Sequence, residues 1–467
     1  FNLDHGTDFA VRVDGMPVNL RSHGHGQGYS DLNFLIPETL ASMSYRKGPY
    51  RAADGDFATA GAADFTLADR FGNHVSSAAG RFGFQRVVAT GGIDDDQRGF
   101  AAAIESQRYQ GPWADLGEDV GKRNALLRYR EAIGDANFSI TAMAYRNRWN
   151  APDQIPERAV ESMQIDRFGS LDQGLGGRSR RDSISATFNT PFAGGEFNAS
   201  AYSIGSELDL WSNFTYALDD NEHGDQFHQF DRRNVSGLSL TQMFERDTFA
   251  LRTGIDLRRD SIEAVGLARS QDRVDRESIR DDVVAERSAS AWIEGEWRFD
   301  EQWRVLLGLR GDRVDYRVTA RETENSGRGD DQRLSPKASL IFSPLHDLEL
   351  YASAGRGFHS NDVRGATISV DPVNGDAIDA VDLLAPATGY EIGSRWFANE
   401  QFHLNAALWA LDLDSELIFV GDAGNTEATR ASERLGVELG LYLFPQARFS
   451  GEIEASFTHA RFSDDDG

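Results

Sequence analysis

Residues 290–310 read SAWIEGEWRFDEQWRVLLGLR, and this stretch decides the fold. Apolar residues occupy every second position of its first half: Ala291, Ile293, Gly295, Trp297 and Phe299. The positions between them carry mainly charge: Glu294, Glu296 and Arg298. Because successive side chains of an extended strand point to opposite faces, this pattern predicts a strand with one oily and one charged face.

The alternation returns after a short turn at residues 300–302. It continues as Trp303, Val305, Leu307 and Leu309, with Arg304 and Arg310 on the other face, so two long strands meet in a hairpin. Three later rows repeat the pattern: residues 402–408, 435–443 and 449–457, with Glu438, Glu452 and Glu454 among the alternate positions. The sequence therefore predicts an all-β protein built from many antiparallel hairpins.

Strand length separates a membrane barrel from a soluble sandwich, because alternation occurs in both. The runs at 285–299 and 303–317 exceed the five or six residues of an ordinary strand and the roughly nine to eleven that a tilted membrane strand needs. Trp297, Phe299 and Trp303 gather beside the turn, as expected for aromatic rings at the headgroup level. We predict a transmembrane β-barrel whose apolar face meets lipid and whose charged face lines the lumen.

The composition excludes several classes of protein. The 467 residues hold 48 Lys and Arg against 74 Asp and Glu, a net charge of -26 that disfavours nucleic acid as a partner. No apolar run reaches the length of about eighteen residues of a membrane helix, and the mean hydropathy is -0.48. No cysteine is present, so disulfides and thiolate metal sites are impossible. The chain opens on Phe1, and we expect any secretion signal to lie outside the residues given.

The chain divides into residues 1–69, which form a small globule with Gly-rich bends, and residues 70–467, where about seventeen strands are predicted from His74 onward. Short connections alternate with long ones, which places all long loops on one side of the sheet. The predicted long loops are 150–181, 211–233, 261–286 and 358–388. Because single-chain bacterial barrels have an even strand count and residues 463–467 are polar, we expect further strands after the end of the sequence.

A set of short motifs follows the same order along the chain. They are Val13-Asp14-Gly15-Met16-Pro17-Val18, residues 24–33, Tyr45-Arg46-Lys47-Gly48-Pro49, a Gly/Ala-rich strand at 57–65, Gly355-Arg356-Gly357-Phe358, Tyr390-Glu391-Ile392-Gly393 and Arg434-Leu435-Gly436-Val437-Glu438. Together with the small globule before a large barrel, they resemble the TonB-dependent outer-membrane receptors. The resemblance implies a barrel of about 22 strands filled by a plug. It implies that residues 1–69 are the C-terminal part of that plug, a small α+β unit inside the lumen.

The resemblance also implies a function. It predicts a receptor in the bacterial outer membrane for active uptake of a scarce solute, such as a ferric siderophore, with TonB as the energy-coupling partner. The other partners are outer-membrane lipid, lipopolysaccharide and the small-molecule or metal-chelate ligand. No enzymatic activity, cofactor or bound metal is predicted. The alternatives are a passive porin or adhesive barrel, in which residues 1–69 are a periplasmic extension, and a secreted soluble β-solenoid.

Members of this family hold the plug through basic residues that face glutamates of the barrel. The alternation sends Glu391 and Glu438 into the lumen, and the implied plug partners are Arg46, Lys47 or Arg51. Lys47 stands where the family usually has arginine, and lysine cannot form a two-pronged contact with a carboxylate. The alternative is that these acids simply line a wet lumen.

Candidate ligand-binding residues lie in the loop at the plug apex, namely His23, His25, Gln27 and Tyr29. His5 with Asp4 and Asp8 extends this cluster, but the spacing is poor for a metal, so contact with a transported ligand or a solvated loop is favoured. His359-Ser360-Asn361-Asp362 contains residue types found in catalytic groups. Because neighbouring residues on a strand point to opposite faces, these side chains are not expected to form a catalytic group. We interpret the acidic run at 94–96 as a solvated turn.

Overall fold

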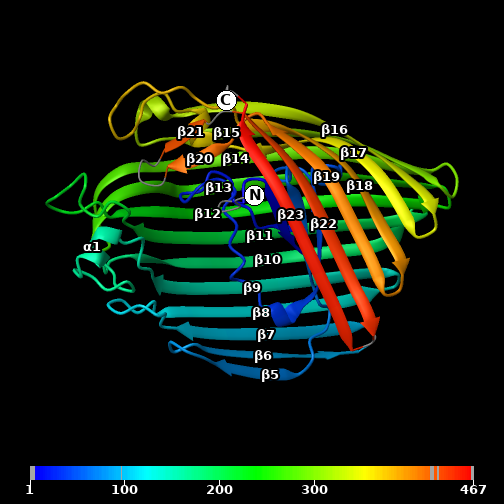
Figure 1. Cartoon of the computed structure of the whole chain (residues 1–467), viewed down its shortest axis with the longest axis horizontal. Coiled ribbons are helices and arrows are strands. Elements are labelled where there is room, and N and C mark those ends of the chain that lie inside the picture. The colour runs from blue at the N-terminus through cyan, green and yellow to red at the C-terminus, as the bar shows by residue number, and fades with distance from the viewer. Residues whose placement is uncertain (1–5, 96, 421–424, 429–430, 447, 464–467) are drawn as a thin grey trace.

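The computed structural model describes residues 6–95, 97–420, 425–428, 431–446 and 448–463. Seventeen strands make one antiparallel sheet curled into a barrel, with successive strands paired in chain order (Figure 1). They are β5 (His74–Ala79), β6 (Gln85–Asp94), β7 (Arg98–Tyr109), β8 (Val120–Ile133), β9 (Ala136–Asn150), β10 (Gly176–Phe192), β11 (Gly195–Ser212), β12 (Phe227–Arg246), β13 (Phe249–Gln271), β14 (Val274–Arg298), β15 (Trp303–Thr319), β16 (Gly327–Leu345), β17 (Leu348–Ser360), β18 (Leu384–Asn399), β19 (Phe402–Leu413), β22 (Ser432–Gln446) and β23 (Phe449–Phe462). The strand number and the all-β class confirm the sequence prediction.

The apolar face of the sheet points outward. Leu435, Val437 and Leu439 of β22 are 59%, 37% and 45% exposed, whereas Glu438 between them contacts Lys47 inside the barrel. A soluble sandwich would reverse this arrangement and bury the leucines. The predicted orientation, with the apolar face outside and the charged face inside, is confirmed.

Aromatic side chains pair beside the short turns. The ring centroids of Phe249 and Trp297 are 4.8 Å apart, and those of Trp303 and Phe342 are 4.4 Å apart. Trp396 and Phe402 continue the row on β18 and β19. Such rings sit favourably at the boundary between lipid tails and water, so the row marks one edge of the membrane band.

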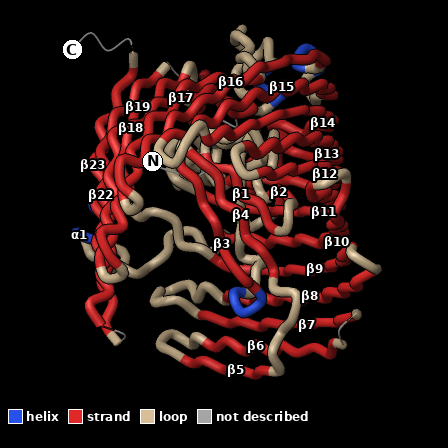
Figure 2. The backbone as a smooth tube through the Cα atoms, turned by 90° about the vertical axis from the view of Figure 1, so that its right-hand side faces the viewer, coloured by secondary structure: helices blue, strands red, loops and turns tan. Residues whose placement is uncertain are grey.

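A second, four-stranded sheet lies within the curve of the barrel (Figure 2). It consists of β1 (Phe9–Val13), β2 (Met16–Pro17), β3 (Leu40–Lys47) and β4 (Gly61–Leu67), in the order β2-β1-β4-β3 with β1 and β4 parallel. We call residues 6–69 with this sheet the inner unit. The 3-10 helix η1 (Pro37–Thr39) starts with a proline, whose fixed φ suits a first helical position. The final strand of the unit begins at Gly61, later than the predicted 57.

The inner unit rests on one side of the barrel through an apolar core. Val13, Met16 and Ile36 are almost fully buried against Leu126 of β8 and Ile204 of β11. Each such side chain contributes about 1.5–3 kcal/mol when it is removed from water. The lumen is therefore packed with protein along β6 to β12, while the contacts to β13 to β18 are mainly polar.

The prediction of a long loop at residues 261–286 is wrong. Residues 261–286 continue β13 and β14 as a long hairpin, closed by a two-residue turn at Asp272 and Arg273. Both residues have positive φ (51° and 64°), the backbone that suits the twist of a tight hairpin. The turn lacks the Asn-Gly or Asp-Gly pair that would have revealed it. Arg273 also donates to the carbonyls of Gly174 (2.7 Å) and Leu175 (2.6 Å), so it ties this hairpin to the neighbouring loop.

The remaining long connections carry short elements. These are α1 (Glu157–Glu161), η2 (Thr323–Asn325), α2 (Val363–Ala366) and the hairpin of β20 (Leu417–Val420) with β21 (Asn425–Ala428). Within the described residues, none of the helices has the length and apolar character needed to cross a membrane.

Candidate functional site

The turn at Lys47-Gly48-Pro49 meets the barrel wall at three glycines. A β-carbon on Gly355 would lie 2.3 Å from the Pro49 carbonyl oxygen, and one on Gly389 or Gly357 would lie 2.7 Å or 2.9 Å from the Pro49 ring. Gly48 itself has φ +68°, which favours glycine. These glycines of β17 and β18 therefore let the inner unit approach the wall at backbone distance.

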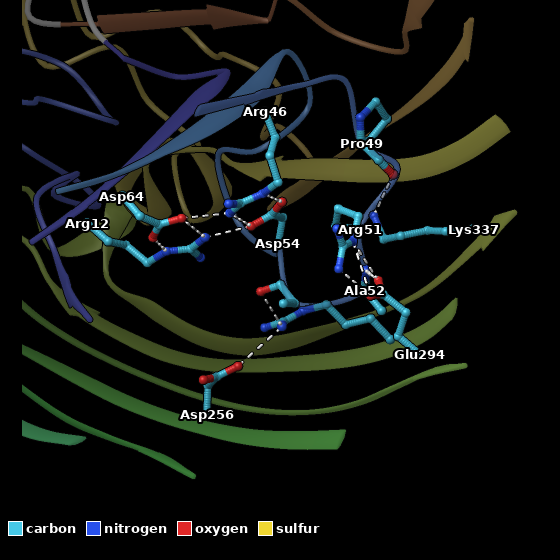
Figure 3. A network of polar contacts seen from close by, with 12 residues as sticks. Arg12, Arg46, Pro49, Arg51, Ala52, Asp54, Asp64, Asp256, Glu294 and Lys337 are labelled. Atoms are coloured by element: carbon cyan, nitrogen blue, oxygen red, sulfur yellow. Dashed lines mark hydrogen bonds and ion pairs between the residues drawn. The ribbon is translucent and has the colours of Figure 1, made fainter. Parts of the chain in front are cut away.

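Lys337 of β16 fixes the same turn. Its ammonium group is buried and donates to the Pro49 carbonyl at 2.8 Å (Figure 3). It also donates to the Arg356 carbonyl at 2.9 Å. The contact joins inner unit and wall through a charge-assisted hydrogen bond, the stronger kind.

Arg51 and Glu294 form the main ion pair between inner unit and barrel (Figure 3). The Arg51 Nη2 atom lies 2.6 Å from Glu294 Oε1, and its Nε atom lies 3.1 Å from both carboxylate oxygens. Glu294, 1% exposed in its side chain, also accepts the Ala52 backbone N–H at 2.9 Å. One buried carboxylate thus binds both a side chain and the main chain of the inner unit.

Four charged residues hold the inner unit together next to this pair. Arg12 contacts Asp54 at 2.6 Å and Asp64 at 2.7 Å, and Arg46 contacts the same two acids at 2.8 Å and 2.7 Å. Burial alone raises the pKa of Asp54, but the two guanidinium groups outweigh it and hold that pKa well below its usual range. Asp54 is consequently a permanent anion at neutral pH.

The structure separates the residues that the sequence grouped as a plug-to-barrel contact. Lys47 forms an ion pair with Glu438, whereas Arg46 contacts Asp54 and Asp64 of its own unit. The Tyr351 hydroxyl donates to Glu391 at 2.6 Å, and no basic side chain of the described residues forms an ion pair with Glu391. A cavity of about 630 Å³ lies beside Lys47, Glu391 and Glu438. Glu438 alone of the two predicted glutamates is paired with the inner unit.

The predicted apex residues are largely covered. His23 and Gln27 are 1% and 2% exposed, while His25 and Tyr29 are partly exposed. The His23 and Tyr29 rings stack with centroids 4.2 Å apart, and His25 Nδ1 lies 3.0 Å from Gln229 Oε1 of β12. His5 and Asp4 lie outside the described residues.

The short helix α2 lies against this apex. The Val363 N–H donates to the Ser22 hydroxyl at 2.9 Å, and Arg364 donates to the His23 carbonyl at 3.1 Å. Asp362 caps α2 by accepting the Arg364 N–H at 2.9 Å. The sequence predicted a long loop here but carried no sign that the loop folds inward.

The His359-Ser360 segment binds the inner unit. His359 Nδ1 lies 3.0 Å from Asp8, and Ser360 donates its N–H and its hydroxyl to Asp56, both at 2.8 Å. His359 Nδ1 and the N–H and hydroxyl of Ser360 are thereby engaged in structural contacts. The acidic turn behaves as predicted where it is described: Asp95 accepts the N–H groups of Gln97 and Arg98.

Sequence reasoning missed Glu294 and Lys337 as contact residues. Both lie on the charged, lumen-facing side of their strands, and the alternation places Glu294 there. The alternation therefore predicts that the Glu294 side chain faces the lumen. It does not predict which residue of the inner unit this side chain contacts, because that depends on which strands face the inner unit.

These observations define a class of protein: a membrane-spanning β-barrel whose lumen is filled by a separate sheet fixed to the wall by buried polar contacts. A family model described as TonB dependent receptor-like, beta-barrel matches residues 108–467. The chain belongs to this family. Its members are transporters and receptors of the bacterial outer membrane, so the chain is an outer-membrane protein without a predicted enzymatic role.

Solved structures show the same fold at low sequence identity. The chain is similar to the ferric yersiniabactin uptake receptor FyuA from Yersinia pestis (TM-score 0.77, 14% identity, 99% of this chain and 71% of that chain). It is also similar to the copper transporter OprC (TM-score 0.77, 17% identity, 98% and 72%). The FrpB iron transporter from Neisseria meningitidis gives a TM-score of 0.73 at 15% identity, with 98% and 72% covered.

Proposed function

We propose that this protein takes up a scarce solute across the outer membrane with energy delivered through TonB. In this proposal residues 1–69 are part of a plug and residues 70–467 form the barrel wall. The family membership supports the proposal, and so does the way the inner unit fills the lumen.

The observation that carries the proposal is the buried attachment of the inner unit to the wall. Arg51 with Glu294 and Lys337 with Pro49 hold one side, and Arg128 contacts Asp14 at 2.5 Å on the other. A solute of some hundreds of daltons passes only if such contacts are released. Releasing buried ion pairs costs several kcal/mol, which argues for an external energy source over passive diffusion.

Single-channel conductance tests this proposal against a passive porin. The full chain in a planar lipid bilayer is expected to show a small, closed baseline, and deletion of residues 1–69 is expected to open a large, steady conductance. A large conductance of the undeleted protein would refute a plug. Equal, small conductance of both proteins would show that the wall itself closes the lumen.

We propose a metal chelate, such as a ferric siderophore, as the solute. The similar structures are described as transporters or receptors of iron, ferric yersiniabactin, copper and ferric citrate, and these descriptions apply to those proteins. In this chain the apex groups that remain partly exposed are His25 and Tyr29, and we propose them as the first contacts of the solute. His23, whose carbonyl accepts from Arg364, and the buried Gln27 would join them only after the apex rearranges.

Growth on defined iron sources tests both solute and coupling. A strain that lacks this protein is expected to lose growth on one chelate from a panel of ferric siderophores and ferric citrate, and a strain without TonB should lose it too. Growth that fails without the protein but persists without TonB would support a passive pore.

A further inference from the structure

Two carboxyl groups oppose each other across β13 and β14 inside the lumen. Asp260 and Glu286 are in register, and both residues are fully buried. Like charges directly opposite each other destabilise a sheet, and a buried charge without a partner is costly. Arg258 compensates Asp260, because its Nε atom lies 2.9 Å and 3.0 Å from the two carboxylate oxygens. Glu286 therefore decides whether the pair carries an uncompensated charge.

Glu286 has no hydrogen-bond or ion-pair partner among the residues that the structure describes. Both of its carboxyl oxygens are buried, and neither receives a hydrogen bond. The titratable and charged groups that face Glu286 are Asp260 on β13, Arg233 on β12, Tyr316 on β15, Arg21 of the inner unit and Asp362 before α2. The ion pairs next to it are Asp56–Arg21, Asp231–Arg233, Asp260–Arg258 and Asp362–Arg364. Both arginines that face Glu286 are thus engaged by other carboxylates.

The apex loop, residues 20–29, covers this part of the wall. Its Arg21 side chain donates to the hydroxyl of Ser288 at 3.0 Å, and Ser288 shares the lumen face of β14 with Glu286. From the wall, Arg233 donates to a carbonyl of the loop at 3.1 Å. The attached loop keeps water away from Glu286, so detachment of the loop exposes the carboxyl to the wet lumen.

We propose that Glu286 is a proton-binding site that links attachment of the apex loop to pH. The carboxyl is the neutral acid while the loop is attached, because a neutral acid avoids both repulsion from Asp260 and the cost of an unpaired buried charge. When the loop detaches and water reaches the carboxyl, its O–H bond breaks and the proton passes to water. The inference concerns attachment alone, so it holds whether or not the protein takes up a solute through TonB.

Acid should strengthen the attachment of the apex loop. The attached state holds a proton that the detached state loses above the ordinary glutamate pKa of about 4.3. Attachment is therefore strongest below that pH and weakens by up to about tenfold for each further pH unit, until Glu286 ionises in the attached state as well. Between about pH 5 and pH 7 we expect the ratio of attached to detached loop to fall by about 10- to 100-fold.

Hydrogen exchange of residues 20–29 in the purified full chain measures this ratio, once the rates are divided by those of an unstructured peptide at each pH. The wild type is compared with Glu286→Gln, which keeps the shape of the side chain and stays neutral at every pH. The matched control is Glu277→Gln on the same strand, where the side chain is 69% exposed. The histidines of the apex titrate in the same pH range but are present in all three proteins, so the difference between the proteins reports on Glu286.

As the pH rises, the wild type and Glu277→Gln should lose at least about tenfold more protection than Glu286→Gln does. An infrared difference spectrum between the wild type and Glu286→Gln at about pH 6 should contain the carbonyl stretch of a protonated carboxylic acid. Absence of this band, or an equal loss of protection in Glu286→Gln, would overturn the proposal. If Glu286→Gln fails to fold, Glu286→Met replaces it with the same expected result, because methionine is also unbranched and needs no hydrogen-bond partner.

Discussion

Replacing Glu294 with glutamine should loosen the inner unit from the barrel. Glutamine keeps the shape of the side chain and one acceptor oxygen, but it removes the charge and turns the other oxygen into a donor that faces Arg51. The buried N–H of Ala52 then competes with Arg51 for a single acceptor. The wall loses its main electrostatic hold on residues 51 and 52.

The magnitude follows from the burial of the two partners. Breaking a fully buried ion pair costs about 3–5 kcal/mol. The Arg51 side chain is 37% exposed and regains some hydration, so we expect about 2–3 kcal/mol, in line with hydrogen bonds to charged groups. This corresponds to about a 30- to 150-fold rise in the ratio of detached to attached inner unit.

Single-channel recording in planar bilayers measures that ratio as the open fraction. The matched control is Glu296→Gln two residues along the same strand. Glu296 approaches Arg298, Arg304 and Arg252 only at 3.6–3.9 Å, all of them on the wall. An unchanged open fraction in Glu294→Gln, or an equal rise in Glu296→Gln, would refute the reasoning. Lys47→Ala should have little effect, because Lys47 is 54% exposed and exposed pairs contribute below about 1 kcal/mol.

Three further changes test other contacts. Gly355→Ala places a methyl group against the Pro49 carbonyl and should raise the open fraction in the same recordings. Asp54 has a lowered pKa in the folded state, so its stabilising charge is fully present above the ordinary carboxyl pKa of about 4 and is lost as the pH falls below it. Hydrogen exchange of β1 and β4 should therefore accelerate only in that acidic range. Asp54→Asn should remove this dependence of the exchange rate on pH. Arg273→Ala should speed proteolysis within residues 151–175, because the Gly174 and Leu175 carbonyls lose their donor.

Each of these has a clear contrary result. Gly311→Ala, whose new methyl group would find its nearest neighbour at 3.9 Å, should behave as the wild type; if it opens the barrel as much as Gly355→Ala, the contact with Pro49 is irrelevant. Acceleration of exchange between pH 7 and 5 would contradict the assignment to Asp54. Unchanged cleavage in Arg273→Ala would show that the loop is held by other contacts.

Alternation predicted the wall well, because each residue reports its own face. Leu435 and Glu438 could be assigned to lipid and lumen from the local pattern alone. The turn at Asp272 was missed because neither of its residues is glycine, although both adopt positive φ. Partner choice was harder: the sequence placed Glu294 in the lumen but held no information on which strand faces Arg51. The contact of α2 with His23 joins segments some 340 residues apart, which no local pattern encodes.

The glycines around Pro49 also constrain the order of assembly. Gly355, Gly357 and Gly389 come about 300 residues after the turn at Pro49 that packs against them. The turn at Pro49 therefore cannot pack against the wall until β17 and β18 are made and paired. Attachment of the inner unit at this turn therefore requires β17 and β18 to be in place.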